Sequence, residues 1–175
     1  MPSTLEVGPL YISVVGSSEC DDRFVELAYG VGREIARRGH VLVCGGLGGV
    51  MEAVSHGAHD AGGISVGILP GTDRSHANRW LTIALPTGMG HARNALVASS
   101  GDALIAISGG HGTLSEMAFG LKMGKPVVGL QSWDLGERPG EEGRIVRAET
   151  PAEAVELAES LVRANRSRSP AEGFD

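Results

Sequence analysis

The segment ALIAISGGHGTLSEMAFGLKMGKPVVGL, residues 103–130, shows the fold class most clearly. Its first five residues are apolar and predict a buried strand, which the turn SGGHGT and a helix to about Met123 follow. Lys125 and Pro126 then precede a second apolar strand, VVGL. A strand, a helix and another strand in this order predict a βαβ unit, in which the two strands run parallel.

The rest of the chain shows the same alternation. Further strands are predicted at residues 10–15, 41–44, 64–69, 81–84 and 145–146. Further helices are predicted from Asp21-Asp22 to about residue 38 and near residues 50–61, 91–99 and 151–163. The composition of residues 134–144 predicts a loop. This pattern predicts a single α/β domain with a doubly wound parallel sheet of about seven strands and helices on both faces. We expect an N-terminal extension over residues 1–9, the domain over 10–164, and a flexible tail over 165–175.

Composition excludes several classes of protein. The formal net charge is −6, which disfavours a partner that is a nucleic-acid polymer, since such proteins usually carry a basic excess. No apolar run approaches the ~18 residues that span a bilayer, and the first ten residues lack a basic stretch followed by an apolar one. Cys20 and Cys44 show no metal-type spacing. We therefore expect a cytoplasmic protein without a membrane partner.

Glycine is concentrated in three turns that follow predicted strands. The chain has 27 glycines, and the densest clusters lie where a parallel sheet of this kind binds its ligands, at the carboxyl ends of the strands. Bare backbone at the start of a helix presents N–H groups to an anion, so these turns predict phosphate binding. The candidate residues are Gly16, Ser17 and Ser18 in the first turn, Gly45, Gly46, Gly48 and Gly49 in the second, and Gly109, Gly110, His111, Gly112 and Thr113 in the third.

The second turn limits the type of ligand. No Lys-Ser or Lys-Thr follows it, as a Walker A loop requires, and it does not match G-x-G-x-x-G, so a dinucleotide is not favoured. Two phosphate-type turns on neighbouring strands suit a phosphorylated sugar or a mononucleotide. The alternative for these glycines is tight packing without a ligand.

Glu116 and Arg93 are the charged candidates near the third turn. Glu116 follows Thr113 by three residues, which allows either a capping box or a carboxylate used in chemistry. Arg93 lies in TGMGHARN, residues 87–94, where its guanidinium could bind a phosphate or a carboxylate. A surface arginine and a partner for Glu116 are the other interpretations. His56 and His59 have helical spacing without a third ligand, which favours a solvated face over a zinc site.

Three segments together carry a resemblance to a known family. CGGLGGVMEAVSHGA at residues 44–58, ARN at 92–94 and SGGHGTLSE at 108–116 resemble the LOG (LONELY GUY) superfamily, in the same order over roughly residues 10–130. The resemblance implies a Rossmann-like nucleotide-binding domain over residues 10–164. LOG phosphoribohydrolases carry PGGxGTxxE and an upstream Arg-Lys pair, and they cleave the N-glycosidic bond of cytokinin or adenosine 5′-monophosphates. For this chain the resemblance implies phosphate binding by Gly109, Gly110, Gly112 and Thr113, with catalytic Glu116 and Arg93 beside it.

Two residues depart from the hydrolase pattern. Ser108 replaces the motif proline, and Asn94 replaces the lysine after the arginine, which removes a positive charge. These departures, and the segment GILPG at residues 67–71, look more like the branch of the superfamily that contains molybdenum-cofactor carrier proteins. The first hypothesis is therefore a binding protein for a phosphorylated nucleotide or pterin-type ligand, with Ser108 and Asn94 among the ligand-binding residues and no cofactor required.

The alternatives are an enzyme and a structural protein. As an enzyme, the chain would be a nucleoside 5′-monophosphate phosphoribohydrolase that uses Glu116 and Arg93. As a structural or regulatory protein, it would be a homo-oligomer with a vestigial phosphate site. Because LOG-like proteins are commonly oligomeric, the resemblance also implies a homo-oligomer, either a dimer or a tetramer.

Overall fold

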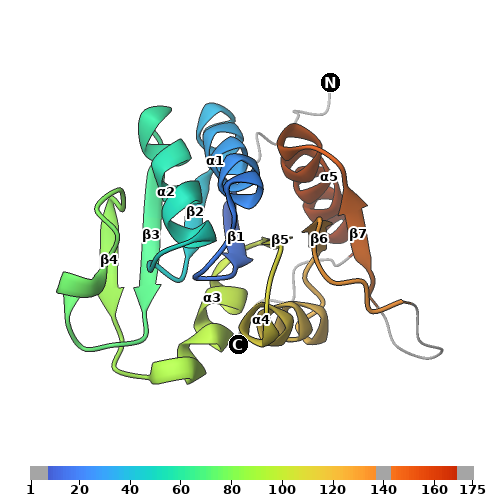
Figure 1. Cartoon of the computed structure of the whole chain (residues 1–175). Coiled ribbons are helices and arrows are strands. Elements are labelled where there is room, and N and C mark those ends of the chain that lie inside the picture. Colours follow the sequence, from blue (N-terminus) through green and yellow to red (C-terminus); the bar gives the residue numbers. More distant parts are fainter. Residues whose placement is uncertain (1–7, 137–142, 169–175) are drawn as a thin grey trace.

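The computed structural model describes residues 8–136 and 143–168 (Figure 1). The helices and strands alternate along the chain as the apolar pattern predicts. In order they are β1 (Tyr11–Gly16), α1 (Asp22–Arg37), β2 (Val41–Cys44), α2 (Val50–Asp60), β3 (Ile64–Leu69), the 3₁₀ helix η1 (Arg74–His76), β4 (Ile83–Pro86), the 3₁₀ helix η2 (Gly90–Arg93), α3 (Asn94–Ser100), β5 (Ala103–Ile107), α4 (His111–Lys122), β6 (Val127–Leu130), β7 (Ile145–Ala148) and α5 (Pro151–Arg168).

The described strands form one seven-stranded sheet in the order β4-β3-β2-β1-β5-β6-β7, and all neighbouring pairs are parallel. The chain winds outward from β1 to β4, returns to the centre at β5, and winds outward again to β7. The predicted doubly wound parallel sheet is thus confirmed. Since β1 and β5 are adjacent and lead to opposite edges, the crevice between their carboxyl ends is the switch point where such sheets bind ligands.

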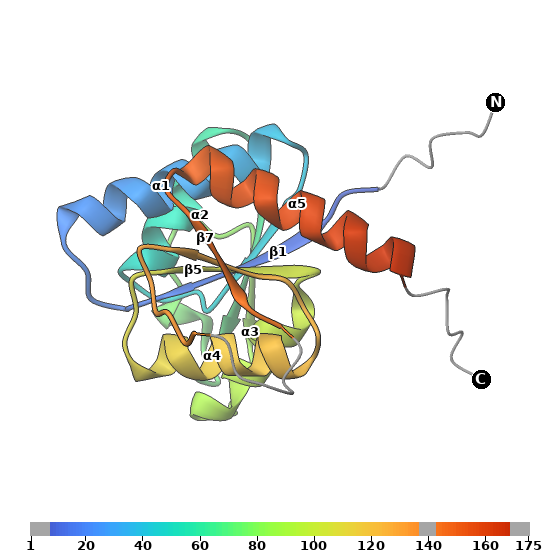
Figure 2. The same ribbon diagram turned by 90° about the vertical axis from the view of Figure 1, so that its right-hand side faces the viewer.

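Helices cover both faces of the sheet (Figures 1 and 2). Helices α1, α2 and α5 lie on one face and α3 and α4 on the other. Alternate residues of the central strands therefore enter two separate cores: Ile12 and Val14 pack with the first group of helices, and Val15 packs with the second. Burial on both faces explains why the strands read as unbroken apolar runs.

Two glycines allow α1 and α2 to pack very closely. A Cβ atom on Gly32 of α1 would lie 1.9 Å from the carbonyl oxygen of Val54, and one on Gly57 of α2 would lie 2.0 Å from that of Tyr29. The backbones of the two helices therefore touch at these two points. This contact fixes α2, and with it the turn that precedes α2 at the edge of the sheet.

Several boundaries differ from the sequence prediction. The fourth strand begins at Ile83, two residues later than expected, because the preceding residues form a turn in which Leu81 donates to the carbonyl of Asn78. The expected helix at 91–99 begins as the 3₁₀ turn η2 and becomes α-helical only at Asn94.

The last helix also extends further than predicted, to Arg168 instead of about residue 163. Asn165 donates to the carbonyl of Gly124 at 3.3 Å, and Arg166 pairs with Asp102 at 2.9 Å, which fixes this charged turn to the domain. Residues 165–168 of the expected tail are thus helical. The remainder of the tail, most of the N-terminal extension and residues 137–142 of the predicted loop lie outside the described residues.

We predict that Gly32→Ala and Gly57→Ala each lower the free energy of unfolding by roughly 3 kcal/mol, because overpacking against a backbone carbonyl cannot be relieved by a side-chain rotation. The matched control is Gly112→Ala, a helical glycine whose Cβ would meet only Asn94 Nδ2, at 4.0 Å. It should leave stability unchanged or raise it. Urea denaturation followed by circular dichroism tests this. Equal stability of all three variants would contradict the close helix contact.

Candidate functional site

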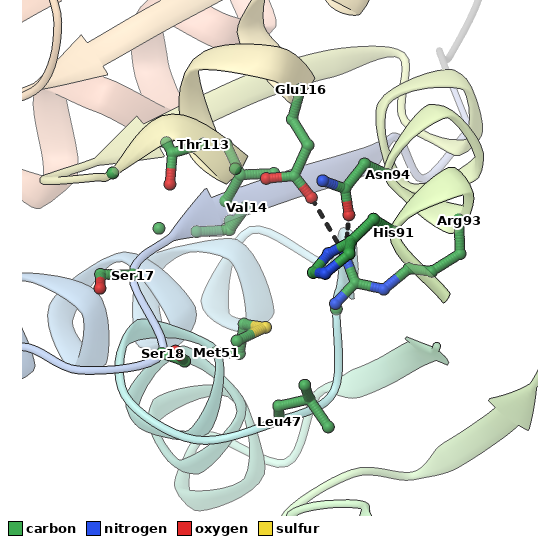
Figure 3. A pocket seen from close by; sticks show the side chains of 15 residues that line it. Val14, Ser17, Ser18, Leu47, Met51, His91, Arg93, Asn94, Thr113 and Glu116 are labelled. Carbon is green, nitrogen blue, oxygen red and sulfur yellow. Dashed lines mark hydrogen bonds and ion pairs between the residues drawn. The ribbon is translucent and has the colours of Figure 1, made fainter. Parts of the chain in front are cut away.

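A cleft of about 230 Å³ opens at the carboxyl edge of the sheet, between the ends of β1, β2 and β5 (Figure 3). All three predicted turns contribute to it, together with η2 and α3. Its lining residues are Val14, Val15, Gly16, Ser17, Ser18, Gly45, Leu47, Met51, His91, Arg93, Asn94, Gly110, Gly112, Thr113 and Glu116. The sequence prediction that the glycine turns converge is therefore confirmed for the cleft, while ligand binding stays a prediction.

Three glycines of the second turn do not line this cleft. Gly49 has a φ of +62°, and a Cβ there would lie 2.4 Å from the carbonyl oxygen of Ser17. Gly46 has a φ of +76° and packs against the side chain of Leu69. Gly48 also lies outside the cleft. For Gly46 and Gly49, tight packing, which was the alternative interpretation of the turns, accounts for the glycine.

The glycines of the third turn also fall into those that line the cleft and those that do not. Gly110 and Gly112 line the cleft, and a Cβ at either would meet no atom closer than 4.0 Å, so packing does not require glycine there. Gly109, by contrast, has a φ of +126° and packs against Thr113. Ser108 and Gly109 line a neighbouring cavity, and the exposed His111 lies outside the cleft.

Two helices begin near the cleft without a side-chain cap. The N-cap residues of α2 and α4 are Gly49 and Gly110, and neither helix has a capping side chain, whereas Asp21 caps α1 by accepting from the backbone of Phe24 at 3.2 Å. The first-turn N–H groups of an uncapped helix need other partners, and the helix dipole favours an anion. At the start of α2 the Val50 N–H already donates to the carbonyl of Ser17 at 3.0 Å, and Gly49 lies outside the cleft. The start of α4, where Gly110 and Gly112 line the cleft, is therefore the helix end that can bind a negatively charged group there.

Glu116 does not form the capping box that its spacing allowed, since α4 has no side-chain cap. Its carboxylate instead accepts from Arg93 Nη1 at 3.3 Å, and both residues are less than 10% exposed. Arg93 Nη1 also donates to Asn94 Oδ1 at 2.6 Å (Figure 3). Of the interpretations of Arg93, a partner for Glu116 is correct and a surface arginine is wrong.

Asn94 connects this pair to the third turn. Its amide Nδ2 donates to Ser115 Oγ at 3.2 Å, and Ser115 Oγ donates to the carbonyl of Gly112 at 2.7 Å. The Nε–H of Arg93 is buried and has no acceptor among the described residues. The protein alone therefore leaves the guanidinium partly unsatisfied.

Burial controls the charge of this pair. Loss of water raises the pKa of Glu116 from 4.5 to about 7, although the positive charge of Arg93 acts in the opposite direction. The same desolvation lowers the pKa of Arg93. A carboxyl group that titrates near neutral pH can hold or release a proton under ordinary conditions, as an acid or base in catalysis must.

The sequence did not single out five residues of the cleft as site residues. They are Val14, Val15, Leu47, Met51 and His91. Four of them are apolar, and their sequence pattern is that of core residues. His91 was noted in the segment before Arg93, but nothing in that segment assigned it a role.

Two further findings concern metal binding and the membrane. Among the described residues no group of histidine, cysteine and acidic side chains is arranged to hold a metal ion. Within residues 8–136 and 143–168, no helix combines the length and the apolar character needed to cross a bilayer.

Comparison with known proteins defines the family. The model of the SLOG cluster4 family matches residues 9–155, and the chain belongs to this family. An uncharacterised protein of Archaeoglobus fulgidus is 49% identical over 122 residues, which cover 70% of this chain and 80% of that protein. A cytokinin riboside 5′-monophosphate phosphoribohydrolase of Rhodococcoides fascians is 40% identical over 98 residues, but the aligned part spans only 50% of that enzyme.

Solved structures match over most of the chain. The molybdenum cofactor binding protein of Rippkaea orientalis is 36% identical, with a TM-score of 0.82 over 89% of this chain and 99% of that one. The molybdenum cofactor carrier protein of Chlamydomonas reinhardtii is 30% identical, with a TM-score of 0.75 over 89% and 99% of the two chains. The predicted resemblance to the LOG superfamily and to its carrier branch is thus confirmed.

We predict that the free energy of unfolding falls as the pH rises from 4.5 to about 7, because Glu116 loses its proton over this range. Because the folded protein holds this proton to higher pH than the unfolded chain, the stabilisation is complete below pH 4.5 and is lost as the pH rises through about 7. The expected loss is roughly 3 kcal/mol. Urea denaturation of the wild type and Glu116→Gln at pH 4.5 and 8 measures it. The variant should lack this part of the pH dependence, and parallel behaviour of the two proteins would contradict the assignment.

Proposed function

We propose that the protein binds a phosphorylated small molecule, a nucleotide or a pterin-type ligand, in the cleft at the carboxyl edge of the sheet. The observation that carries the proposal is that the uncapped N-terminus of α4 and a buried guanidinium meet in one cleft. A phosphate there accepts hydrogen bonds from the bare turn at Gly110 and Gly112 and from the hydroxyl of Thr113. The partly unsatisfied Arg93 supplies the positive charge.

The comparisons with known proteins support a binding protein, because the binding proteins match this chain over a greater part of their own length than the hydrolase does. The two molybdenum cofactor proteins align over 99% of their own length, whereas the aligned hydrolase from Rhodococcoides fascians is matched over half of its length. In addition, Asn94 stands where the hydrolase pattern has a lysine, and its amide binds Arg93 and Ser115. The cleft of this chain thus has one fewer cation than the hydrolase pattern requires.

We predict that Gly112→Val weakens binding of GMP and of ribose 5-phosphate at least tenfold. Gly112 lines the cleft in open space, so the new side chain fills the phosphate position without a clash in the fold. The matched control is Gly71→Val, because Gly71 also has open space around its Cβ position but lies outside the cleft. Calorimetric titration gives the affinities, and thermal stabilisation by ligand gives an independent readout.

The control variant should bind both ligands as the wild type does. If Gly112→Val binds as tightly as Gly71→Val, the third turn does not hold the phosphate. If the wild type binds neither GMP nor ribose 5-phosphate, the proposed function is wrong.

A second candidate function is hydrolysis of nucleoside 5′-monophosphates, and one observation favours it. Glu116 is buried beside Arg93 in the same cleft, with a pKa near 7. A carboxylate there can activate a water molecule for addition to the sugar carbon, or stabilise the positive charge that develops on the sugar as the base leaves. The products would be the free base and ribose 5-phosphate.

We predict that wild-type protein incubated with AMP, GMP, CMP and IMP releases no free base, as chromatography would show, and that Glu116→Gln retains nucleotide affinity within a few fold. One result would contradict this prediction. Release of base by the wild type that falls at least a hundredfold in Glu116→Gln, with nucleotide binding retained, would establish the enzyme and replace the carrier proposal.

A further inference from the structure

A second and larger cavity lies between the start of α1 and the outer side of α2. Its volume is about 600 Å³. We call it the aromatic groove, and its lining residues are Ser18, Glu19, Cys20, Val25, Gly49, Glu52, Ala53, His56, Arg79 and Trp80. The aromatic groove is open to solvent, and only Ser18 belongs also to the cleft.

The aromatic groove and the cleft are neighbours. Ser18 lines both cavities, and Gly49, which lines the groove, packs directly against the backbone of Ser17 and Ser18. Gly48 adds no side chain beside this contact, and a Cβ there would lie 3.6 Å from the carbonyl of Ser18. The ridge between the cavities thus consists largely of backbone, so a single elongated ligand can reach over it.

The far wall of the aromatic groove is held in place by Asn78. Its backbone N–H donates to the carbonyl of Gly46 at 2.9 Å, and its side-chain amide donates to the carbonyl of Leu47 at 3.1 Å. Its side-chain oxygen accepts from the backbone of Trp80 at 3.2 Å. Asn78 thereby fixes Trp80 to the second glycine turn.

Trp80 presents a flat surface on this wall. His56 stacks on one face of the indole, with ring centroids 3.9 Å apart and planes inclined by 12°. The guanidinium of Arg79 lies 4.4 Å from the centroid of the indole, and the tilted ring of His59 lies 5.4 Å from it. Of these neighbours Arg79 is an exposed side chain. A planar heterocycle can take the position of this side chain and stack on the indole or on the guanidinium.

Two carboxylates complete the aromatic groove. Glu52 in the first turn of α2 and Glu19 before α1 are both exposed, and within the described residues neither carboxylate makes a hydrogen bond or an ion pair. An ionised carboxylate only accepts hydrogen bonds, and its two oxygens can accept two parallel N–H groups. The groove therefore favours a heterocycle whose edge carries two adjacent donors.

We propose that the aromatic groove binds the heterocycle of the ligand whose phosphate lies in the cleft, and that Glu52 selects a 2-amino-4-oxo-pyrimidine edge. Guanine and pterin rings both carry this edge, with a ring N–H beside an exocyclic amino group. Adenine lacks two adjacent donors, so the groove discriminates against it. This inference rests on the proposed function and adds the class of heterocycle to it.

Calorimetric titration with GMP, AMP and ribose 5-phosphate tests the proposal. The wild type should bind GMP at least tenfold more tightly than AMP, because only guanine offers Glu52 two adjacent N–H donors for charge-assisted hydrogen bonds. Glu52→Gln should remove most of this preference and leave ribose 5-phosphate binding unchanged. The matched control is Glu26→Gln, which changes an exposed glutamate of α1 outside both cavities.

Trp80→Phe provides a second readout, since it retains a ring for stacking but removes part of its area. It should weaken GMP and AMP alike, several-fold, and again spare ribose 5-phosphate. Equal affinities of the wild type for GMP and AMP, or a GMP preference that survives Glu52→Gln, would overturn the groove assignment while ribose 5-phosphate binding still upheld the cleft. Absence of binding by all three ligands would overturn both proposals.

Discussion

The guanidinium of Arg93 joins segments that are far apart in the sequence. It binds Glu116 of α4 and Asn94 of α3, and it lies so close to the second turn that a Cβ on Gly45 would approach its Nη2 to 2.6 Å. The acid at 116 and the amide at 94 are thus partners of one buried cation, and the glycine at 45 leaves room for that cation and for the side chain of Met51. Because burial of a charge is costly without partners, the shape of the whole cleft depends on this interaction.

The fold and the general place of the site could be predicted because their causes are local. Each central strand is an apolar run, each turn is rich in glycine, and alternation with helices allows few arrangements other than a parallel sheet. Parallel strands then bring the turns after β1, β2 and β5 to one edge. The boundaries near Leu81 and Arg166 were predicted less well. The first depends on a turn in which Leu81 donates to Asn78, and the second on the bond of Arg166 to the distant Asp102.

The sequence could not show which glycines are needed for packing and which line the cleft. Gly46 and Gly110 hold the same place in the two Gly-Gly-x-Gly turns, yet the first packs against the side chain of Leu69 and the second faces open space in the cleft. Only the relative positions of the turns decide between these roles. The aromatic groove was missed for a related reason: the spacing of His56 and His59 indicated a solvated helix face, and nothing nearby in the sequence showed that Trp80 would stack on it.

The central claim is that a phosphate binds at the uncapped start of α4. The most direct test is a titration of ¹⁵N-labelled protein with ribose 5-phosphate, followed by the chemical shifts of assigned backbone amides. We expect the largest, saturable changes at the amides of Gly110, Gly112 and Thr113, with smaller changes in the turn at Ser17 and Ser18. Shifts confined to other parts of the chain, or no saturable shifts at these amides, would contradict it.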